Sequence, residues 1–257
     1  MPLPHRTETL KQYELKLFWR RIFDFNWKFG LFLIFIVCIP RFILVLYANA
    51  LGNYSSIGLI MLISATAPFI FLTAYGRKKI GITKPKKYSW LLIAFIAGLI
   101  FSFLLYYLGK SLYGNSYENW YQYIGKSYKI PAAISQHDKA ILFAVVTLTG
   151  ITFSPIGEEL FFRGIVHSSF EKSIGEAKAS IVESSAFAIT HISHFGLVFV
   201  NNQWSFLVTP TLFWVSGMFL VSVMFFAFRK YSGSILGAIV CHAAFNLGMI
   251  YCIFYLL

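Results

Sequence analysis

The sequence predicts an all-α membrane protein built as a bundle of spanning helices, and three observations favour this fold. First, 58% of the 257 residues are hydrophobic and only 12% are charged, with a mean hydropathy of +0.67. A soluble domain carries about 25% charged residues. Second, the apolar residues form long blocks, and about 20 consecutive apolar residues cross a hydrocarbon core. Third, lysine and arginine gather in every second segment between these blocks.

Seven blocks are long and apolar enough to be spans, so we expect a polytopic bundle of about seven helices, within limits of six to eight. The predicted spans are residues 27–46, 57–75, 90–108, 140–162, 179–199, 207–228 and 234–257. The three cysteines, Cys38, Cys241 and Cys252, all lie inside these blocks. Their spacing is not that of a disulfide framework, so we expect them to be small apolar residues of the helix bundle.

The distribution of lysine and arginine orients the predicted bundle. Residues 1–28 carry six basic side chains and residues 76–87 carry six more, whereas residues 47–57 and 196–206 carry none. Because basic segments stay on the cytoplasmic side, we expect a multi-pass protein of the cell membrane with a cytoplasmic N-terminus and an external C-terminus. The net charge of +12 then indicates contact with the lipid bilayer, and we expect no nucleic-acid partner.

Charged side chains are costly inside a bilayer and usually functional, and three of them lie in or at the end of the fourth predicted span. Glu159 and Arg163 are four residues apart and can pair on one helix face. Glu158 points about 140° away from Arg163 at ~100° per residue. We therefore predict an internal ion pair of Glu159 with Arg163. The Glu158 carboxylate is then free to face a cavity, and it needs partners from other helices.

Two other spans supply polar partners at helical spacing. Phe187 and His191 share one face of the fifth predicted span, and His242 and Asn246 share one face of the seventh. At ~1.5 Å per residue, Glu158, His191 and His242 lie roughly 20, 20 and 14 Å from the cytoplasmic ends of their spans. These groups are therefore predicted to meet at a similar depth in one polar site, reachable from the cytoplasmic side.

The motifs Glu-Glu-x-x-x-Arg, Phe-x-x-x-His and His-x-x-x-Asn follow one another in separate spans. Together they resemble the type II CAAX prenyl endopeptidase family, also called the CAAX protease and bacteriocin-processing (CPBP) family, over roughly residues 148–257. On this resemblance, residues 1–139 form an N-terminal interfacial segment with three spans, and residues 140–257 form a catalytic membrane domain of four spans. His167 and His194 fall outside the motifs, and His167 is expected to face elsewhere.

The resemblance implies an intramembrane endopeptidase that hydrolyses a peptide bond. Glu158 would act as general base on a water molecule, and His191 would hold that water or shuttle its proton. His242 and Asn246 would donate hydrogen bonds to the developing oxyanion. Glu159 and Arg163 would hold Glu158 in place, and Phe187 would be a further supporting residue.

A zinc site is the alternative that the sequence leaves open for the same side chains. Glu158, His191 and His242 would make a set of two histidines and one carboxylate with room for a water molecule. However, the chain has no His-Glu-x-x-His motif. We therefore favour a glutamate-activated water without a metal and commit to no cofactor.

The expected partner is a membrane-associated peptide or protein substrate. Prenylated peptides and pheromone-like or bacteriocin-like peptides are the candidates that the resemblance implies. The alternative function is a non-enzymatic membrane scaffold or bacteriocin self-immunity protein, in which the same polar cluster only packs helices. A transporter is disfavoured because the sequence shows neither an internal repeat nor paired broken helices.

Overall fold

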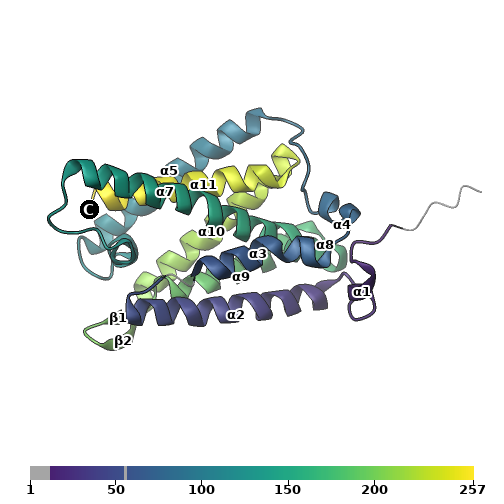
Figure 1. Cartoon of the computed structure of the whole chain (residues 1–257), viewed down its shortest axis with the longest axis horizontal. Coiled ribbons are helices and arrows are strands. Elements are labelled where there is room, and N and C mark those ends of the chain that lie inside the picture. The colour runs from purple at the N-terminus through teal and green to yellow at the C-terminus, as the bar shows by residue number, and fades with distance from the viewer. Residues whose placement is uncertain (1–11, 55–56) are drawn as a thin grey trace, which may run out of the picture.

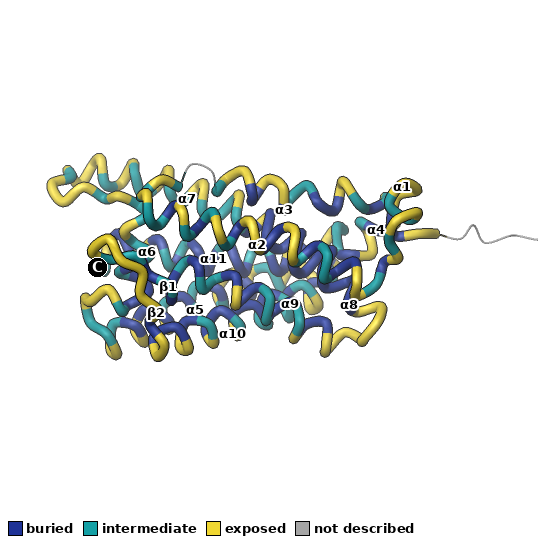
Figure 2. Tube along the Cα trace, turned by 90° about the horizontal axis from the view of Figure 1, so that it is seen from below, coloured by how far each residue is buried: buried dark blue, intermediate teal, exposed yellow. Residues whose placement is uncertain are grey.

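In the computed structural model, which describes residues 12–54 and 57–257, long helices run side by side along one axis of the molecule (Figure 1). The elements are α1 (Leu17–Arg20), α2 (Trp27–Leu51), α3 (Ile57–Phe71), α4 (Ala74–Lys79), α5 (Ser89–Tyr113), α6 (Trp120–Gly125), η1 (Lys126–Tyr128), α7 (Gln136–Glu158), η2 (Glu159–Val166), α8 (His167–Ile174), α9 (Glu176–Thr190), η3 (His191–Ser193), β1 (Leu197–Val200), β2 (Gln203–Phe206), α10 (Val208–Ser232) and α11 (Ile235–Tyr255). Buried residues follow the inner faces of the helices, and exposed ones lie on the outer faces and at the two ends (Figure 2).

Within the part of the chain that the structure describes, five helices are long and apolar enough to cross a membrane: α2, α5, the continuous helix Gln136–Ile174, α10 and α11. The all-α membrane bundle agrees with the prediction. The other two predicted spans correspond to α3 and α9, which have 15 residues each. The continuous helix Gln136–Ile174 has 39 residues and is about 58 Å long, so it extends beyond a hydrocarbon core of about 30 Å.

The prediction of one helix over residues 179–199 is wrong at its end. Helix α9 stops at Thr190, a 3₁₀ turn follows, and β1 pairs with β2 in an antiparallel hairpin. Asn201 and Asn202 form the tip with φ angles of 52° and 60°. Consecutive left-handed residues of this kind make the two-residue hairpin turns in which asparagine is favoured. The Asn-Asn pair was therefore the signal for a hairpin.

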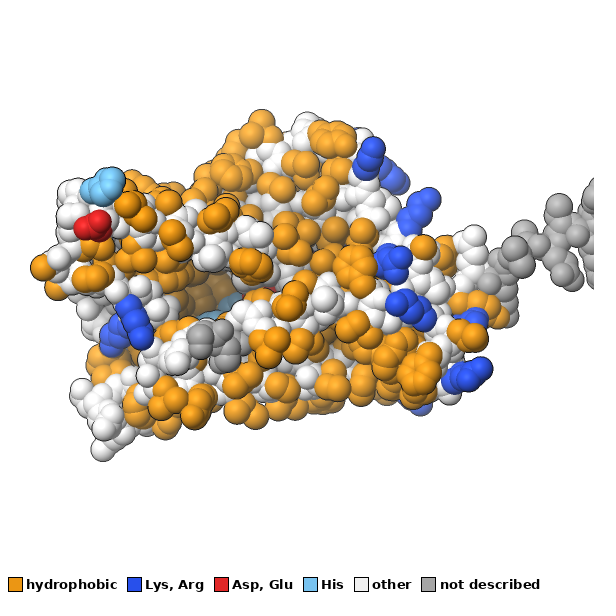
Figure 3. Space-filling model, in the orientation of Figure 1, with side chains coloured by type: hydrophobic (Ala, Val, Ile, Leu, Met, Phe, Trp, Pro, Cys, Tyr) orange, Lys and Arg blue, Asp and Glu red, His pale blue; other side chains and the backbone are white. Residues whose placement is uncertain are grey.

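The two ends of the bundle differ in charge. The end formed by α1, α4, α8 and the α10–α11 connection is called here the basic end. Its lysines and arginines are Lys16, Arg20, Arg21, Lys28, Arg77, Lys78, Lys79, Lys84, Lys86, Lys87, Lys172, Lys178, Arg229 and Lys230. The opposite end, formed by α6, η1 and the β1–β2 hairpin, is called the hairpin end; its lysines are Lys110, Lys126, Lys129 and Lys139. Figure 3 shows the blue side chains gathered mainly at the basic end.

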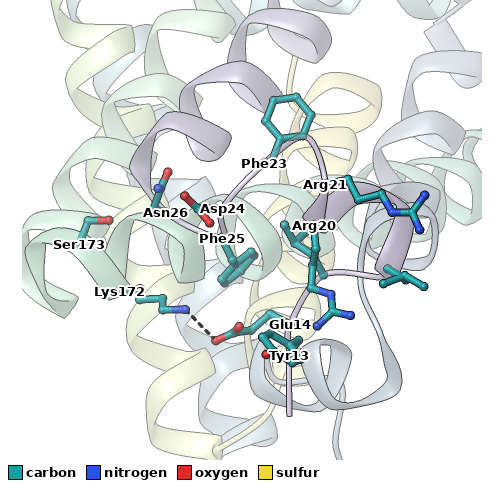
Figure 4. A pocket seen from close by; sticks show the side chains of 12 residues that line it. Tyr13, Glu14, Arg20, Arg21, Phe23, Asp24, Phe25, Asn26, Lys172 and Ser173 are labelled. Atoms are coloured by element: carbon teal, nitrogen blue, oxygen red, sulfur yellow. Dashed lines mark hydrogen bonds and ion pairs between the residues drawn. The ribbon is translucent and has the colours of Figure 1, made fainter. Parts of the chain in front are cut away.

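The described part of the N-terminal segment is fastened to the basic end. Thr73 N donates to Glu14 O at 2.9 Å, and the Glu14 carboxylate accepts from Lys79 and Lys172 at 2.8 and 3.4 Å. A cavity of about 720 Å³ lies beside this contact, with Arg20 and Arg21 on its wall (Figure 4). The predicted interfacial segment is helical only over α1 within the described residues, and its first eleven residues lie outside them.

Helix α11 is the innermost of the helices that carry the site. It packs against α5, α7 and α10. A Cβ atom at Gly98 of α5 would collide with the carbonyl oxygen of Cys241, and one at Gly248 of α11 would lie 2.7 Å from Ser102 Oγ. Glycine therefore allows the backbones of α5 and α11 to approach closely, as small residues do at helix contacts in membranes. This contact fixes the position of His242 on α11.

Candidate functional site

The carboxylate of Glu158 lies at the bottom of a cavity of about 540 Å³ near the middle of the bundle. Glu158 is the last residue of α7, where the α-helix passes into the π-helical segment η2. A π-helix inside an α-helix is rare and frequently occurs at functional sites. The hollow is open on the face drawn in Figure 3, with histidine and carboxylate colours at its base. Glu158 thus faces a cavity, as the sequence predicted.

The two oxygens of Glu158 have different surroundings. Oε1 accepts from Arg41 Nη2 at 2.9 Å and from Ser154 Oγ at 2.5 Å. Oε2 is buried and has no hydrogen-bond partner among the residues that the structure describes. It lies 4.0 Å from His191 Nε2. One oxygen is therefore held by two donors while the other remains available to a small molecule in the cavity.

The sequence predicted that Glu158 needs partners from other helices, and Arg41 was missed as one of them. Arg41 lies in α2, its side chain is 4% exposed, and its guanidinium forms a buried ion pair with Glu158. A signal existed in the sequence, because a charge inside an apolar span needs an opposite charge. Glu158 was the carboxylate without an assigned partner.

His191 is held at the point where α9 ends and the 3₁₀ turn begins. Its Nδ1 lies 2.7 Å from Phe187 O, and its own carbonyl oxygen accepts from Trp214 Nε1 at 3.1 Å. A carbonyl can only accept, so Nδ1 carries the proton and Nε2 of the neutral ring is an acceptor. Asn49 of α2 donates to Ser193 O at 2.8 Å and fastens the same turn. The acceptor nitrogen of His191 therefore faces Glu158.

His242 contacts the second glutamate of the motif. Its Nδ1 lies 2.6 Å from Glu159 Oε1, and its ring stacks on Phe225 at 4.6 Å between centroids. Because a carboxylate only accepts, Nδ1–H of His242 donates to Glu159 and leaves Nε2 free. Glu159 also contacts Arg163, as predicted, with Nη1 3.2 Å from Oε1. The expected support of Glu158 by Glu159 and Arg163 is thus replaced by support of His242.

Phe187 and Asn246 complete the predicted set. The Phe187 ring lies 4.3 Å from the His191 ring and 6.1 Å from the His242 ring, and the Arg163 guanidinium lies 4.3 Å from its centre. Asn246 lines the cavity, and its Nδ2 donates to Gly150 O at 3.0 Å. An amide nitrogen has two hydrogens, so one remains for another acceptor. The structure therefore brings the predicted residues of all three motifs together.

His167 and His194 both fall outside the motifs, but they differ in their position relative to the cavity. His167 stacks on Phe226 and does not line the cavity, as predicted. His194 does line it, with its ring 5.2 Å from that of His191. Its position follows from the 3₁₀ turn, which the sequence-based helix over residues 179–199 did not include. His194 is thus a cavity residue that the motif pattern does not reveal.

The donor set does not form a metal site. Among the described residues, no group of three or more His, Cys, Asp or Glu side chains is arranged to hold a metal ion. The Arg41 guanidinium also occupies the side of Glu158 at Oε1, where its positive charge opposes a second cation. The three residues considered for zinc therefore do not fit it, and no reaction step below uses a metal.

Tyrosines border the cavity toward the hairpin end. Tyr54, which follows α2, donates to Asn49 Oδ1 at 2.7 Å, and the Tyr123 hydroxyl accepts from Phe199 N at 2.8 Å. Burial, together with the nearby Tyr123, raises the pKa of Tyr54 to about 12. Burial also raises the pKa of Tyr123. Both phenols are therefore neutral at physiological pH and carry no charge into the cavity.

Three motifs, from three helices, thus converge on one cavity with the expected residues. Residues 140–248 match the family described as type II CAAX prenyl endopeptidase Rce1-like. The match confirms, for this part of the chain, the resemblance to a CAAX protease family that the motifs indicated. Neither a curated protein nor a solved structure matches the chain. The family and the apolar helices make this a membrane protein.

Proposed function

We propose that this Rce1-like protein is a multi-pass intramembrane endopeptidase that hydrolyses a peptide bond of a membrane-associated substrate with a glutamate-activated water molecule. The observation that supports this most directly is the free Oε2 atom of Glu158, buried in the cavity and 4.0 Å from His191 Nε2. A water molecule that makes hydrogen bonds of about 2.8 Å can bridge two acceptors at this separation. Its hydrogens then point to Glu158 and His191, and a lone pair points toward the substrate.

The reaction balances with these side chains. The water oxygen forms a bond to the carbonyl carbon while a water proton passes to Glu158, with His191 as the second acceptor. The C–N bond of the tetrahedral intermediate then breaks, and the proton passes to the leaving amine. The products are a peptide with a new carboxyl group and a peptide with a new amino group.

The oxyanion of the intermediate needs hydrogen-bond donors. The free Nδ2 hydrogen of Asn246 is one, and Nε2 of His242 becomes a second when the ring is protonated. The Glu159 carboxylate contacts Nδ1 at 2.6 Å and holds this ring in place. Glu159 thus acts through His242 and is a positioning residue, and Arg41 and Ser154 act in the same way on Glu158.

Glu158→Gln tests the proposal. We expect this variant to fold and to abolish cleavage, because an amide cannot take the water proton. Comparative proteomics of membrane and secreted peptides from cells with wild type or Glu158→Gln should show substrates that accumulate uncleaved. Glu171→Gln is the matched control, because Glu171 lies at the basic end with an exposed side chain.

Unchanged peptide profiles in the Glu158→Gln cells would contradict the protease proposal. The scaffold or immunity alternative predicts a different result, in which Glu158→Gln lowers folding and any resistance phenotype together. The match to a protease family does not favour that alternative.

A further inference from the structure

The cavity extends from Glu158 in one direction only. On α11 it is lined from His242 to Ile250, on α7 from Glu158 back to Thr149, and on α2 from Arg41 to Asn49. Each of these runs leads toward the hairpin end, because α11 ends there, α7 starts there and α2 ends there (Figure 1). The loop residues Tyr54 and Ser127 extend the lining at that end.

The path from Glu158 to the basic end is filled. The residues that follow Glu158, from Glu159 to Phe170, are all buried, and Phe161, Phe162 and Ile165 belong to the hydrophobic core. None of these residues lines the cavity. The expectation of access from the cytoplasmic side therefore disagrees with the structure, in which the cavity lies on the other side of Glu158.

The charges of the two ends assign the sides of the membrane. In the described residues, fourteen lysines and arginines lie at the basic end and four lysines at the hairpin end. Short basic segments stay in the cytoplasm during insertion. The basic end is thus expected in the cytoplasm and the hairpin end outside.

From these observations we infer that the substrate enters from the external half of the membrane, as an uncharged apolar peptide segment. This inference rests on the proposed protease function. It adds the side of the membrane from which the substrate enters and the chemical class of that substrate. Between Glu158 and the cavity mouth the side chains are mainly apolar, including Met61, Phe153, Met249 and Ile250. The only lining carboxylate and the only lining guanidinium within the described residues, Glu158 and Arg41, are paired with each other. A charged segment would find no counter-charge here and is disfavoured.

A lateral entrance suits such a segment. The cavity is lined by Ile57, Gly58 and Met61 at the start of α3 and by Phe153 on α7. The hollow between these two helices is visible on the side of the bundle in Figure 3. An apolar peptide in the outer leaflet can therefore reach Glu158 without crossing the bundle, whereas a peptide in the cytoplasm faces the packed core around Phe161.

Two serine-to-cysteine variants test the side of access. In a background where Cys38, Cys241 and Cys252 are replaced by serine or alanine, Ser127→Cys places a thiol at the cavity mouth and Ser173→Cys places one at the basic end. A membrane-impermeant maleimide applied to intact cells should label Ser127→Cys and leave Ser173→Cys unlabelled. In inverted vesicles the pattern should reverse. Labelling of Ser127→Cys from the cytoplasmic face, or from neither face, overturns the proposal.

A second measurement separates this proposal from the proposed function. In intact cells, a bulky impermeant maleimide on Ser127→Cys should abolish the cleavage identified with Glu158→Gln, and the same reagent on Ser173→Cys cells should leave it unchanged. If cleavage depends on Glu158 but the reagent does not stop it, only the access proposal fails. If no peptide depends on Glu158, the protease proposal fails whatever the labelling pattern is.

Discussion

Arg41 lies outside the matched segment and is still part of the candidate site. It lies on α2, in the N-terminal half of the chain, and contacts the carboxylate that we propose as the general base. An ion pair with both side chains less than 5% exposed is strongly destabilising when one partner is removed, since the other charge is left buried and unpaired. The N-terminal half therefore contributes directly to the site.

Arg41→Met should destabilise the protein more than the double variant Arg41→Met/Glu158→Gln. The single variant leaves a buried carboxylate without its cation, a loss of about 3–5 kcal/mol, whereas the double variant leaves a neutral amide. Thermal unfolding of the purified protein in detergent measures the difference. If the double variant is no more stable than the single one, Arg41 and Glu158 do not form a charged pair in the folded protein.

Glu159→Gln should lower kcat by up to about 10²–10³ and change KM little, because Glu159 positions His242 as an oxyanion donor while the cavity is unaltered. The glutamine can still accept from Nδ1–H of His242, but a neutral amide holds this N–H less strongly than a carboxylate does. Arg163 keeps its contacts to Glu183 and Ser222, so the fold should persist. Steady-state kinetics on a substrate from the proteomic screen provide the test, with Glu176→Gln as a surface control. An unchanged kcat would remove Glu159 from the mechanism.

The helices show what the sequence could predict and what it could not. Long apolar blocks, helical spacing and three motifs were sufficient for the bundle and for the convergence of Glu158, His191 and His242. The first strand of the hairpin was missed because Leu197–Val200 is as apolar as a span, so the Asn-Asn signal that follows it was not used. The sequence could show that Arg41 needs an opposite charge, but not the contact itself, because a contact between helices distant in the sequence depends on packing, which hydropathy does not encode.

Gly98→Ala should destabilise the bundle by about 1–3 kcal/mol, the range for overpacking in a packed interior. The added methyl group would collide with the carbonyl oxygen of Cys241 and push α5 away from α11. Gly58→Ala is the matched control, because nothing lies within 4 Å of a Cβ atom there and alanine is the better helix former. Unfolding in detergent compares the two variants. Equal stabilities would indicate that α5 and α11 are not in close contact.

At the scale of the whole molecule, the bundle has one charged end, one weakly charged end and a reactive group between them. The fastening of the N-terminal segment at the basic end is itself electrostatic. Burial acts to raise the pKa of the Glu14 carboxyl, but the hydrogen bond from Lys79 and the charges of Lys79 and Lys172 outweigh it and hold the pKa below the usual 4.5. The ionised form of Glu14 thus favours the folded state.

Wild type should be more stable than Glu14→Gln above pH 4.5, the ordinary pKa of this carboxyl. A pKa that is lower in the folded state gives stability that is present above the unfolded pKa and is lost as the pH falls through the folded one. The advantage of wild type should therefore shrink in acid. Unfolding midpoints in detergent over about pH 3 to 7 test this linkage. A pH-independent difference would show that Glu14 acts by packing alone, and Glu118→Gln at the hairpin end provides the control.

The close contact of α5 with α11 has a consequence for how the chain can be divided. Helix α5 lies outside residues 140–248, yet it supplies the surface on which His242 is mounted. The matched segment is therefore incomplete as a folding unit. The connection of residues 129–135 is mostly exposed and contains no helix. A gene split at this connection would leave every helix intact, and we expect its two products to reassemble when they are made in the same cell.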